Sequence, residues 1–269
     1  MLGKRLLSVA ILAPITIGAL IAGGWALTLF IVILIGLAAW EFSRMFNNGG
    51  YSSFSAAIII CSVAFVLSRQ LYGFEHSDFM IGGFILVLMA WHTLKYQQGV
   101  ETSALDFTIS LGGIFYLGWA IAYFISIRNL PNGVWWVFLV VLGIAFADAG
   151  AYFIGRAIGK HKMMSRVSPK KSWEGYLGGI FVTMVLTGIT ATIFHNSVSS
   201  ISPLDGVLVG LVMGSLAPLG DFGESMLKRA FGIKDSSNLI PGHGGFLDRL
   251  DSFLWAAIIG YYFISILLI

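Results

Sequence analysis

The chain has 269 residues, of which 57% are hydrophobic and only 11% are charged, whereas a soluble domain carries about 25% charged residues. A mean hydropathy of +0.87 excludes an ordinary soluble domain. It predicts an all-α polytopic integral membrane protein, because a helix satisfies its own backbone hydrogen bonds in lipid.

The net charge of +3 says little by itself, and no nucleic-acid partner is expected. The single cysteine, Cys61, lies in an apolar run and excludes an internal disulfide.

Nine apolar segments follow one another along the chain, each long enough to cross about 30 Å of hydrocarbon as a helix. Turns rich in Gly, Asn and Pro separate several of them. The first segment is expected to be a retained helix, because no small-residue cleavage site follows it. The predicted spans are 6–23, 24–42, 54–72, 79–95, 107–127, 134–155, 174–194, 204–221 and 252–269.

The basic residues are distributed unevenly between the two sides of such a protein. If the N-terminus is cytoplasmic, only Arg69 and Arg128 lie on the far side, and every other Lys and Arg is cytoplasmic. Membrane proteins carry this excess on their cytoplasmic side. The sequence therefore predicts a multi-pass protein of the cytoplasmic membrane whose active site faces the cytoplasm.

The polar residues divide the chain into two regions. Residues 1–133 consist of apolar helices with short loops and are expected to be mainly a scaffold. Residues 134–269 contain two charged stretches, 148–174 and 221–251, and are expected to form the catalytic region.

Four aspartates of the second region are candidate metal ligands: Asp148, Asp221, Asp248 and Asp251. Acids in or beside a membrane are costly unless paired, so they mark functional sites. Several carboxylates facing one point suit Mg²⁺, which prefers oxygen ligands. The alternative for each one is an ordinary ion pair or a bond to a neighbouring helix.

A glycine-rich turn at 241–245 directly precedes Asp248. Successive amides in such a turn can form an anion site, although many such runs are only turns. His243 in this run either donates to a phosphate or only satisfies the loop, and both readings stay open.

Basic residues cluster between Arg156 and Lys171, with serines and Glu174 beside them. Such a cluster can simply attract anionic lipid. A phosphate-rich substrate with a metal explains the basic and the acidic clusters together.

The C-terminal motifs resemble one known family. The stretches Ser225–Arg229, Lys234–Asp235 and Ile240–Asp251 closely resemble the signature of phosphatidate cytidylyltransferases. Ser168–Gly175 looks like the second characteristic stretch of that family, and 148–160 fits the same pattern.

The resemblance implies a reaction and its site. The phosphate of phosphatidic acid would attack the α-phosphorus of CTP and release pyrophosphate, giving CDP-diacylglycerol, with a divalent cation, normally Mg²⁺. A second cation, for which K⁺ is one candidate, fits the number of carboxylates. The expected metal ligands are Asp221 and Asp248, then Asp148 and Asp251, and the expected catalytic residues are Asp221, Asp248, Lys171 and Arg249. The expected substrate-binding residues are Arg166, Ser168, Lys170, Lys171, Ser172, Glu174, Lys228, Arg229, His243, Gly244 and Gly245.

Other functions are less consistent with the sequence. An ether-linked lipid phosphate is the nearest alternative substrate, because acyl and ether chains are both apolar surface. A CDP-alcohol phosphotransferase is disfavoured, since its Asp-Gly-x-x-Ala-Arg type of run is absent. A transporter is also disfavoured, because the charge is confined to one half and no repeat is visible. Glycine-rich helix faces permit a homodimer.

Overall fold

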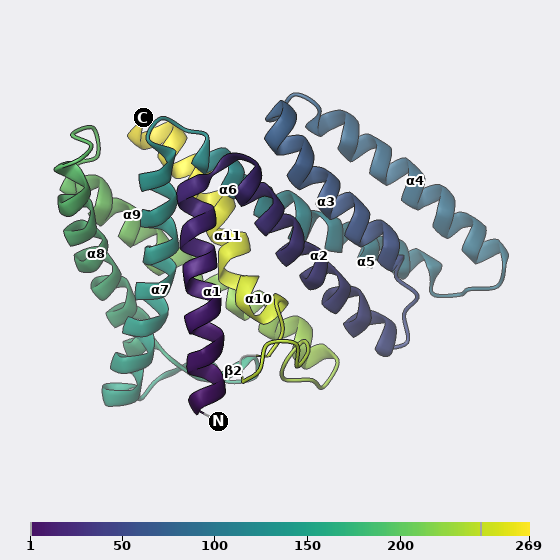
Figure 1. Cartoon of the computed structure of the whole chain (residues 1–269). Coiled ribbons are helices and arrows are strands. Elements are labelled where there is room, and N and C mark those ends of the chain that lie inside the picture. The colour runs from purple at the N-terminus through teal and green to yellow at the C-terminus, as the bar shows by residue number, and fades with distance from the viewer. Residues whose placement is uncertain (1, 243) are drawn as a thin grey trace. The chain divides into compact units, whose positions relative to one another are not determined.

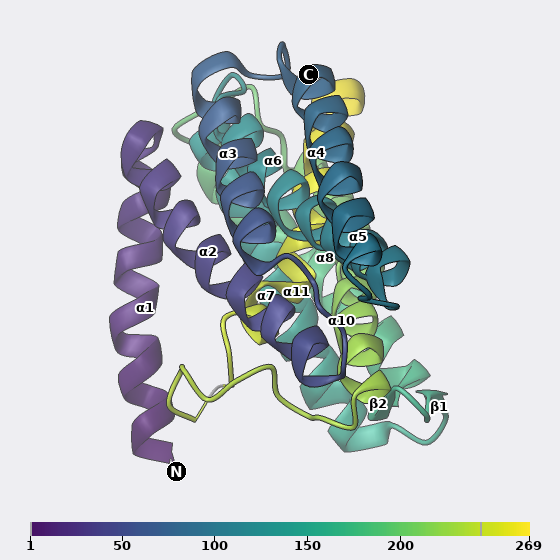
Figure 2. The ribbon, with the colours of Figure 1, turned by 90° about the vertical axis from the view of Figure 1, so that its right-hand side faces the viewer.

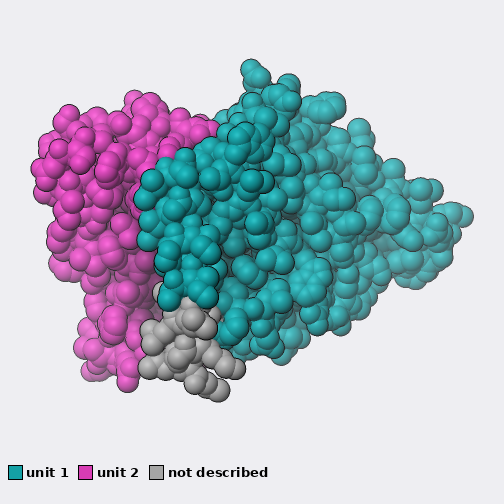
Figure 3. All heavy atoms as spheres, viewed as in Figure 1, with its two compact units in different colours: residues 1–126, 230–250 teal, residues 127–229, 251–269 magenta. Residues whose placement is uncertain are grey.

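The computed structural model, drawn in Figure 1, describes residues 2–242 and 244–269. It divides into two compact units, which Figure 3 colours separately. Unit 1 contains residues 1–126 and 230–250, and unit 2 contains residues 127–229 and 251–269. The predicted division at residue 133 separates scaffold from catalytic function, and it stays a prediction.

Unit 1 is formed by the helices of the first half and by the connection that precedes the last helix. Its elements are α1 (Leu2–Ala22), α2 (Gly24–Asn48), α3 (Ser55–Tyr72), α4 (Ser77–Gln97), α5 (Ser103–Gly113), the π-helical turn η1 (Ile114–Trp119) and most of α6 (Ala120–Arg128). α2 packs on α3, α3 on η1, and α4 on α5. Figure 2 shows α3, α4 and α5 side by side.

Unit 2 is built around three helices that pack on one another, α7, α8 and α9. Its elements are α7 (Gly133–Ile158), β1 (Lys162–Met164), β2 (Ser168–Ser172), α8 (Trp173–His195), α9 (Pro203–Leu216), α10 (Pro218–Ala230), most of α11 (Leu247–Phe263) and η2 (Ile264–Leu268). The two strands form an antiparallel hairpin, in which Lys162 pairs with Ser172 and Met164 with Ser168.

The helices agree with the predicted spans. Within the described residues, eight helical stretches are long and apolar enough to cross a membrane. They correspond to the second to ninth predicted segments. α1 corresponds to the first, and its described apolar run is Ala10–Ala22. The prediction of an all-α polytopic membrane protein is confirmed.

The eighth predicted segment, 204–221, is longer in the structure and contains a break. α9 ends at Leu216 and α10 begins at Pro218, which has no backbone N–H to donate. The Tyr176 hydroxyl of α8 donates to the Ser215 carbonyl at 2.7 Å, so an acceptor beside the break has a partner, as lipid surroundings require. α10 then continues to Ala230 and carries Asp221 in its first turn.

Arg69, near the end of α3 in unit 1, is buried among aromatic rings. Only 3% of the residue is exposed, and its guanidinium carbon lies 3.5 Å from the ring centroid of Phe74 and 4.9 Å from that of Tyr123. It also donates to the Ser126 hydroxyl at 3.2 Å. Ring faces attract a cation, which explains how an apolar helix accommodates this charge.

Glycines set the spacing of the unit 2 helices. A Cβ added at Gly150 of α7 would lie 2.9 Å from the Val182 Cβ and 3.1 Å from the Gly179 Cα. Likewise, a Cβ at Gly214 of α9 would lie 2.9 Å from the Ile180 Cα. Small residues let helix backbones approach closely in membranes. The positions of the side chains that α7, α8 and α9 carry therefore depend on these glycines.

We expect Gly150→Ala to lower the melting temperature in detergent, because the new methyl group would have to displace α8. Overpacking of this kind costs about 1–3 kcal/mol. Gly36→Ala is the matched control, since Gly36 also lies inside a long helix and a Cβ there meets nothing within 4 Å. A Gly150→Ala protein that melts with the wild type would contradict the close packing.

Candidate active site

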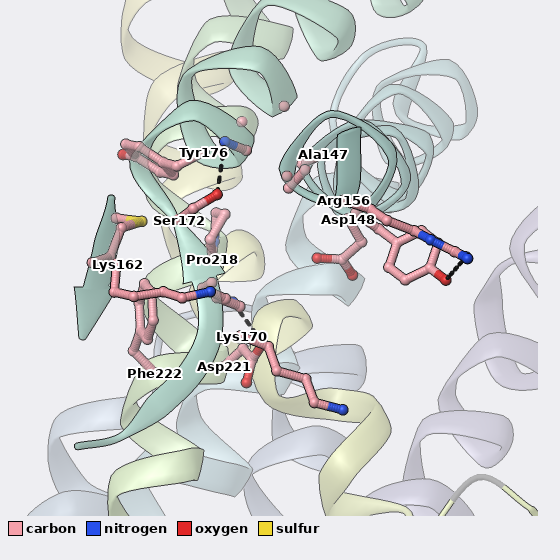
Figure 4. Close-up of a pocket in the computed structure, with 18 residues that line it drawn as sticks. Ala147, Asp148, Arg156, Lys162, Lys170, Ser172, Tyr176, Pro218, Asp221 and Phe222 are labelled. Carbon is pink, nitrogen blue, oxygen red and sulfur yellow. Dashed lines mark hydrogen bonds and ion pairs between the residues drawn. The ribbon is translucent and has the colours of Figure 1, made fainter. Parts of the chain in front are cut away.

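Unit 2 contains a cavity of about 530 Å³ whose walls come from α7, the hairpin, α8, α9 and α10. Figure 4 shows the Asp148 carboxylate extending from α7 into this space. Its charged lining side chains are Asp148, Arg156, Lys162, Lys170, Lys171 and Asp221. Acidic and basic groups therefore face one cavity, as the sequence predicts for 148–174 and Asp221.

Three carboxylates gather where α10 and α11 meet in unit 2. Asp221, Glu224 and Asp251 each offer an oxygen, and these oxygens all lie within 4.8 Å of one another. Oxygen ligands in this number and spacing suit a hard divalent cation such as Mg²⁺. The residues present therefore fit a metal site.

The close approach of α10 and α11 depends on Gly220. A Cβ at Gly220 would lie 2.9 Å from the Ser252 Cα and 2.9 Å from the carbonyl carbon of Asp251. No larger side chain fits between these backbones without movement. Gly220 thus brings Asp251 close to Asp221, the residue that follows Gly220 in the chain.

Lysines pair with two of the three carboxylates. Lys171 Nζ lies 2.6 Å from Asp221 Oδ2 and 4.4 Å from the ring centroid of Phe222. Glu224 is fully buried and forms an ion pair with Lys228, one helical turn later. These cations offset the repulsion that neighbouring carboxylates would otherwise feel. Asp221 also accepts a hydrogen bond from the Ser225 hydroxyl at 3.1 Å.

Glu224 is not among the predicted metal ligands. The spacing of three residues from Asp221 places it on the same helical face, and that spacing was the available signal. The metal roles predicted for Asp148 and Asp248 stay predictions, since within the described residues neither belongs to this group of three.

Two predicted substrate-binding residues hold the hairpin onto α8. Ser172 is the N-cap of α8, and its hydroxyl accepts from Gly175 N at 3.2 Å. Glu174 accepts from the backbone N–H groups of Lys160, at 3.0 Å, and His161, at 3.2 Å, and its Oε1 lies 2.5 Å from His161 Nδ1. Both side chains thus have a local structural use, and their contact with substrate stays a prediction.

The remaining predicted residues of unit 2 differ in exposure. Lys170 is exposed and lines the cavity, and Arg166, in the hairpin turn, and Arg229, at the end of α10, are also exposed. Ser168 is half-buried at the start of β2, where it pairs with Met164. Of these four, only Lys170 lies in the cavity wall.

The glycine-rich turn and Asp248 belong to unit 1. Asp248 Oδ2 accepts from the N–H groups of Ser236, at 2.9 Å, and Gly245, at 2.7 Å, and from the Ser236 hydroxyl at 2.9 Å. Gly244 has a φ of 80°, which favours glycine, and its carbonyl accepts from Ile240 N at 2.8 Å. The Gly245 amide is therefore engaged with Asp248 in this structure. Arg249 is exposed on the first turn of α11, and His243 lies outside the described residues.

Glu41 of α2 is a further polar residue that the sequence does not single out. It is fully buried and accepts hydrogen bonds from the segment that carries Asp248, including Leu247 N at 2.8 Å. The available signal was an acid within an apolar run, which is costly unless it has partners.

Comparisons with known proteins identify the family of this chain. The model of the Cytidylyltransferase family matches residues 3–267. A phosphatidate cytidylyltransferase of Bacillus subtilis is 33% identical over 267 residues, covering 98% of this chain and 97% of the relative. A protein of the same name from Pseudomonas aeruginosa is 34% identical over 267 residues, covering 96% and 94%. One from Synechocystis is 32% identical over 293 residues, covering 98% and 97%. The chain therefore belongs to the cytidylyltransferase family and is a nucleotidyltransferase with helices suited to span a membrane.

Proposed function

We propose that this protein is a phosphatidate cytidylyltransferase, which joins CTP to phosphatidic acid and forms CDP-diacylglycerol and pyrophosphate. Relatives of that name match it over nearly their whole length. The observation that carries the proposal is the cavity of unit 2, where basic side chains and Asp221 line one space. A nucleotide triphosphate with a metal has the charge pattern that such a lining accommodates.

The phosphates of CTP are held by basic side chains of the cavity wall, for which Lys170, Lys162 and Arg156 are the candidates. An oxygen of the phosphatidic acid phosphate attacks the α-phosphorus of CTP. The bond from that phosphorus to the oxygen of the β-phosphate breaks, and its electron pair leaves with pyrophosphate. The chain needs no nucleophile of its own, so its residues act by positioning the substrates and neutralising charge.

We further propose that Asp221, Glu224 and Asp251 hold Mg²⁺. When bound, the ion neutralises phosphate charge during the transfer. The chain contributes the spacing of the three carboxylates, which Gly220 permits, and their orientation. Lys171 holds Asp221 by its ion pair, and Lys228 holds Glu224.

The proposed orientation places the N-terminus and the active site on the cytoplasmic side of the membrane. It rests on the distribution of Lys and Arg along the sequence, which follows the positive-inside rule.

The first expected result concerns the reaction and its metal. With CTP, phosphatidic acid and Mg²⁺, the purified protein should release pyrophosphate and form CDP-diacylglycerol. Asp221→Asn and Asp251→Asn should each lower the rate by about 100-fold or more, since each removes a charged ligand that stabilises the transferred phosphoryl group.

Asp78→Asn is the matched control for this assay, because Asp78 is an exposed carboxylate in the first turn of α4. Active Asp221 and Asp251 variants would leave the reaction intact and overturn the metal assignment. Product from an ether-linked lipid phosphate but not from phosphatidic acid would replace phosphatidic acid as the proposed lipid substrate. Failure with every lipid phosphate would overturn the proposed function.

A second expected result concerns CTP binding. Lys170→Ala should raise the KM for CTP by about three- to tenfold and change kcat less, because a charge-assisted contact to phosphate is lost. Steady-state kinetics with varied CTP measure both constants. Lys95→Ala is the control, since Lys95 lies at the end of α4 and contacts Gln98. An unchanged KM for CTP would remove Lys170 from the binding site.

A further inference from the structure

The connection between α10 and α11 is tied to α2 at two separate points of unit 1. The first is aromatic: the ring of Phe231 lies 4.8 Å from that of Phe46 and 6.2 Å from that of Tyr51. Gly49 leaves room for this contact, since a Cβ there would meet the Phe231 ring. Edge-to-face rings at these distances attract one another. The beginning of the connection is thereby docked at the end of α2.

The second point is the Glu41 carboxylate, whose two oxygens each accept two hydrogen bonds. Oε1 accepts from the Ser237 hydroxyl at 2.6 Å and from Phe246 N at 3.0 Å. Oε2 accepts from the Ser236 hydroxyl at 3.0 Å and from Leu247 N at 2.8 Å. Glu41 is fully buried, so its charge depends on these donors rather than on water.

These four donors lie at both ends of the glycine-rich loop. Ser236 and Ser237 precede the loop, whereas Phe246 and Leu247 follow it, and Leu247 is the first residue of α11. Figure 2 shows the described part of this segment as an irregular connection, and its described residues form no helix or strand between α10 and α11. Glu41 therefore fixes both ends of a segment whose described residues contain only an isolated bridge between Ile240 and Gly244.

Asp248 is coupled to Glu41 through one side chain. The Ser236 hydroxyl shares its single proton between Glu41 Oε2, at 3.0 Å, and Asp248 Oδ2, at 2.9 Å. Gly245 packs between these groups, because a Cβ at this position would meet both the Ser236 hydroxyl and the Glu41 carboxylate. Movement of Glu41 would thus be transmitted directly to the segment that orients Asp248.

We propose that Glu41 is a positioning residue of the enzyme, which holds residues 236–248 and so sets the orientation of Asp248 for the transfer reaction. The effect on catalysis rests on the proposed function, whereas the effect on the segment does not. The second helix, in the region expected to be mainly a scaffold, would then contribute to catalysis through Asp248.

Glu41→Gln is the decisive variant, because it keeps the size of the side chain while it removes the negative charge and changes the hydrogen bonding. An amide has one accepting oxygen and two N–H donors. The amide nitrogen of this variant would therefore replace one carboxylate oxygen and face the two donors that now bond to that oxygen. Hydrogen–deuterium exchange should show faster exchange in peptides covering 236–248, with peptides of α7, α8 and α9 unchanged. The kcat for CDP-lipid formation should fall by about 10- to 100-fold with little change in the KM for CTP.

Asp106→Asn is the matched control in the same unit. Asp106 is also fully buried and accepts from Ser52 N and from the Thr102 hydroxyl, both at 2.7 Å, and neither donor belongs to the segment 236–248. It should lower the melting temperature about as much as Glu41→Gln and leave kcat and the exchange of 236–248 at wild-type levels. If kcat falls as much in Asp106→Asn as in Glu41→Gln, Glu41 contributes only to the general stability of the fold, and the inference is overturned.

Ser237→Ala is the milder variant and decides the question if Glu41→Gln does not fold. It removes one donor to Glu41 and should raise exchange at 236–248 and lower kcat in the same direction, by a smaller factor. Unchanged exchange at 236–248 in the variants, or faster exchange with unchanged kcat in an active enzyme, would overturn the inference. If the wild type makes no CDP-lipid, the proposed function fails, and the exchange result alone still decides whether Glu41 holds the segment.

Discussion

Most of this structure depends on how a carboxylate is accommodated in a chain that is only 11% charged. An ion removed from water needs donors or a counter-ion, and the penalty without them is large. Glu224 is paired with Lys228, Asp221 with Lys171, and Glu41 with two hydroxyls and two backbone amides. Each acid is thus held by neighbours that the fold must bring to it, and this requirement constrains the surrounding helices.

Glycine is what allows the backbones to approach closely enough for these contacts. Gly220 lets α10 approach α11 beside Asp251, and Gly150 lets α7 approach α8. Gly245 leaves space for the Glu41 carboxylate. In a protein without water in its apolar region, packing and hydrogen bonds provide the association between helices. The contacts of the acids therefore depend on glycines at the neighbouring positions.

The sequence predicts the helices well and the site in part. A long apolar run is a strong sequence signal for a membrane helix, and all nine predicted spans are helices in the described residues. The hairpin at 162–172 is not predicted, because its residues are polar and lack the alternation of a strand. Glu224 and Glu41 are missed for a different reason. Their importance arises from neighbours that only tertiary structure brings close, which are Asp251 of α11 for Glu224 and the amides of Phe246 and Leu247 for Glu41.

The bonds of Glu41 join residues that are 195 to 206 positions apart in the chain. During synthesis, α2 is complete long before residue 236 has been made, so none of these four donors is yet available to Glu41. Its final environment exists only after the start of α11 has emerged. The last helix to be made therefore completes the burial of an acid in the second, and a nascent chain that stops before residue 246 leaves Glu41 without either of its amide donors.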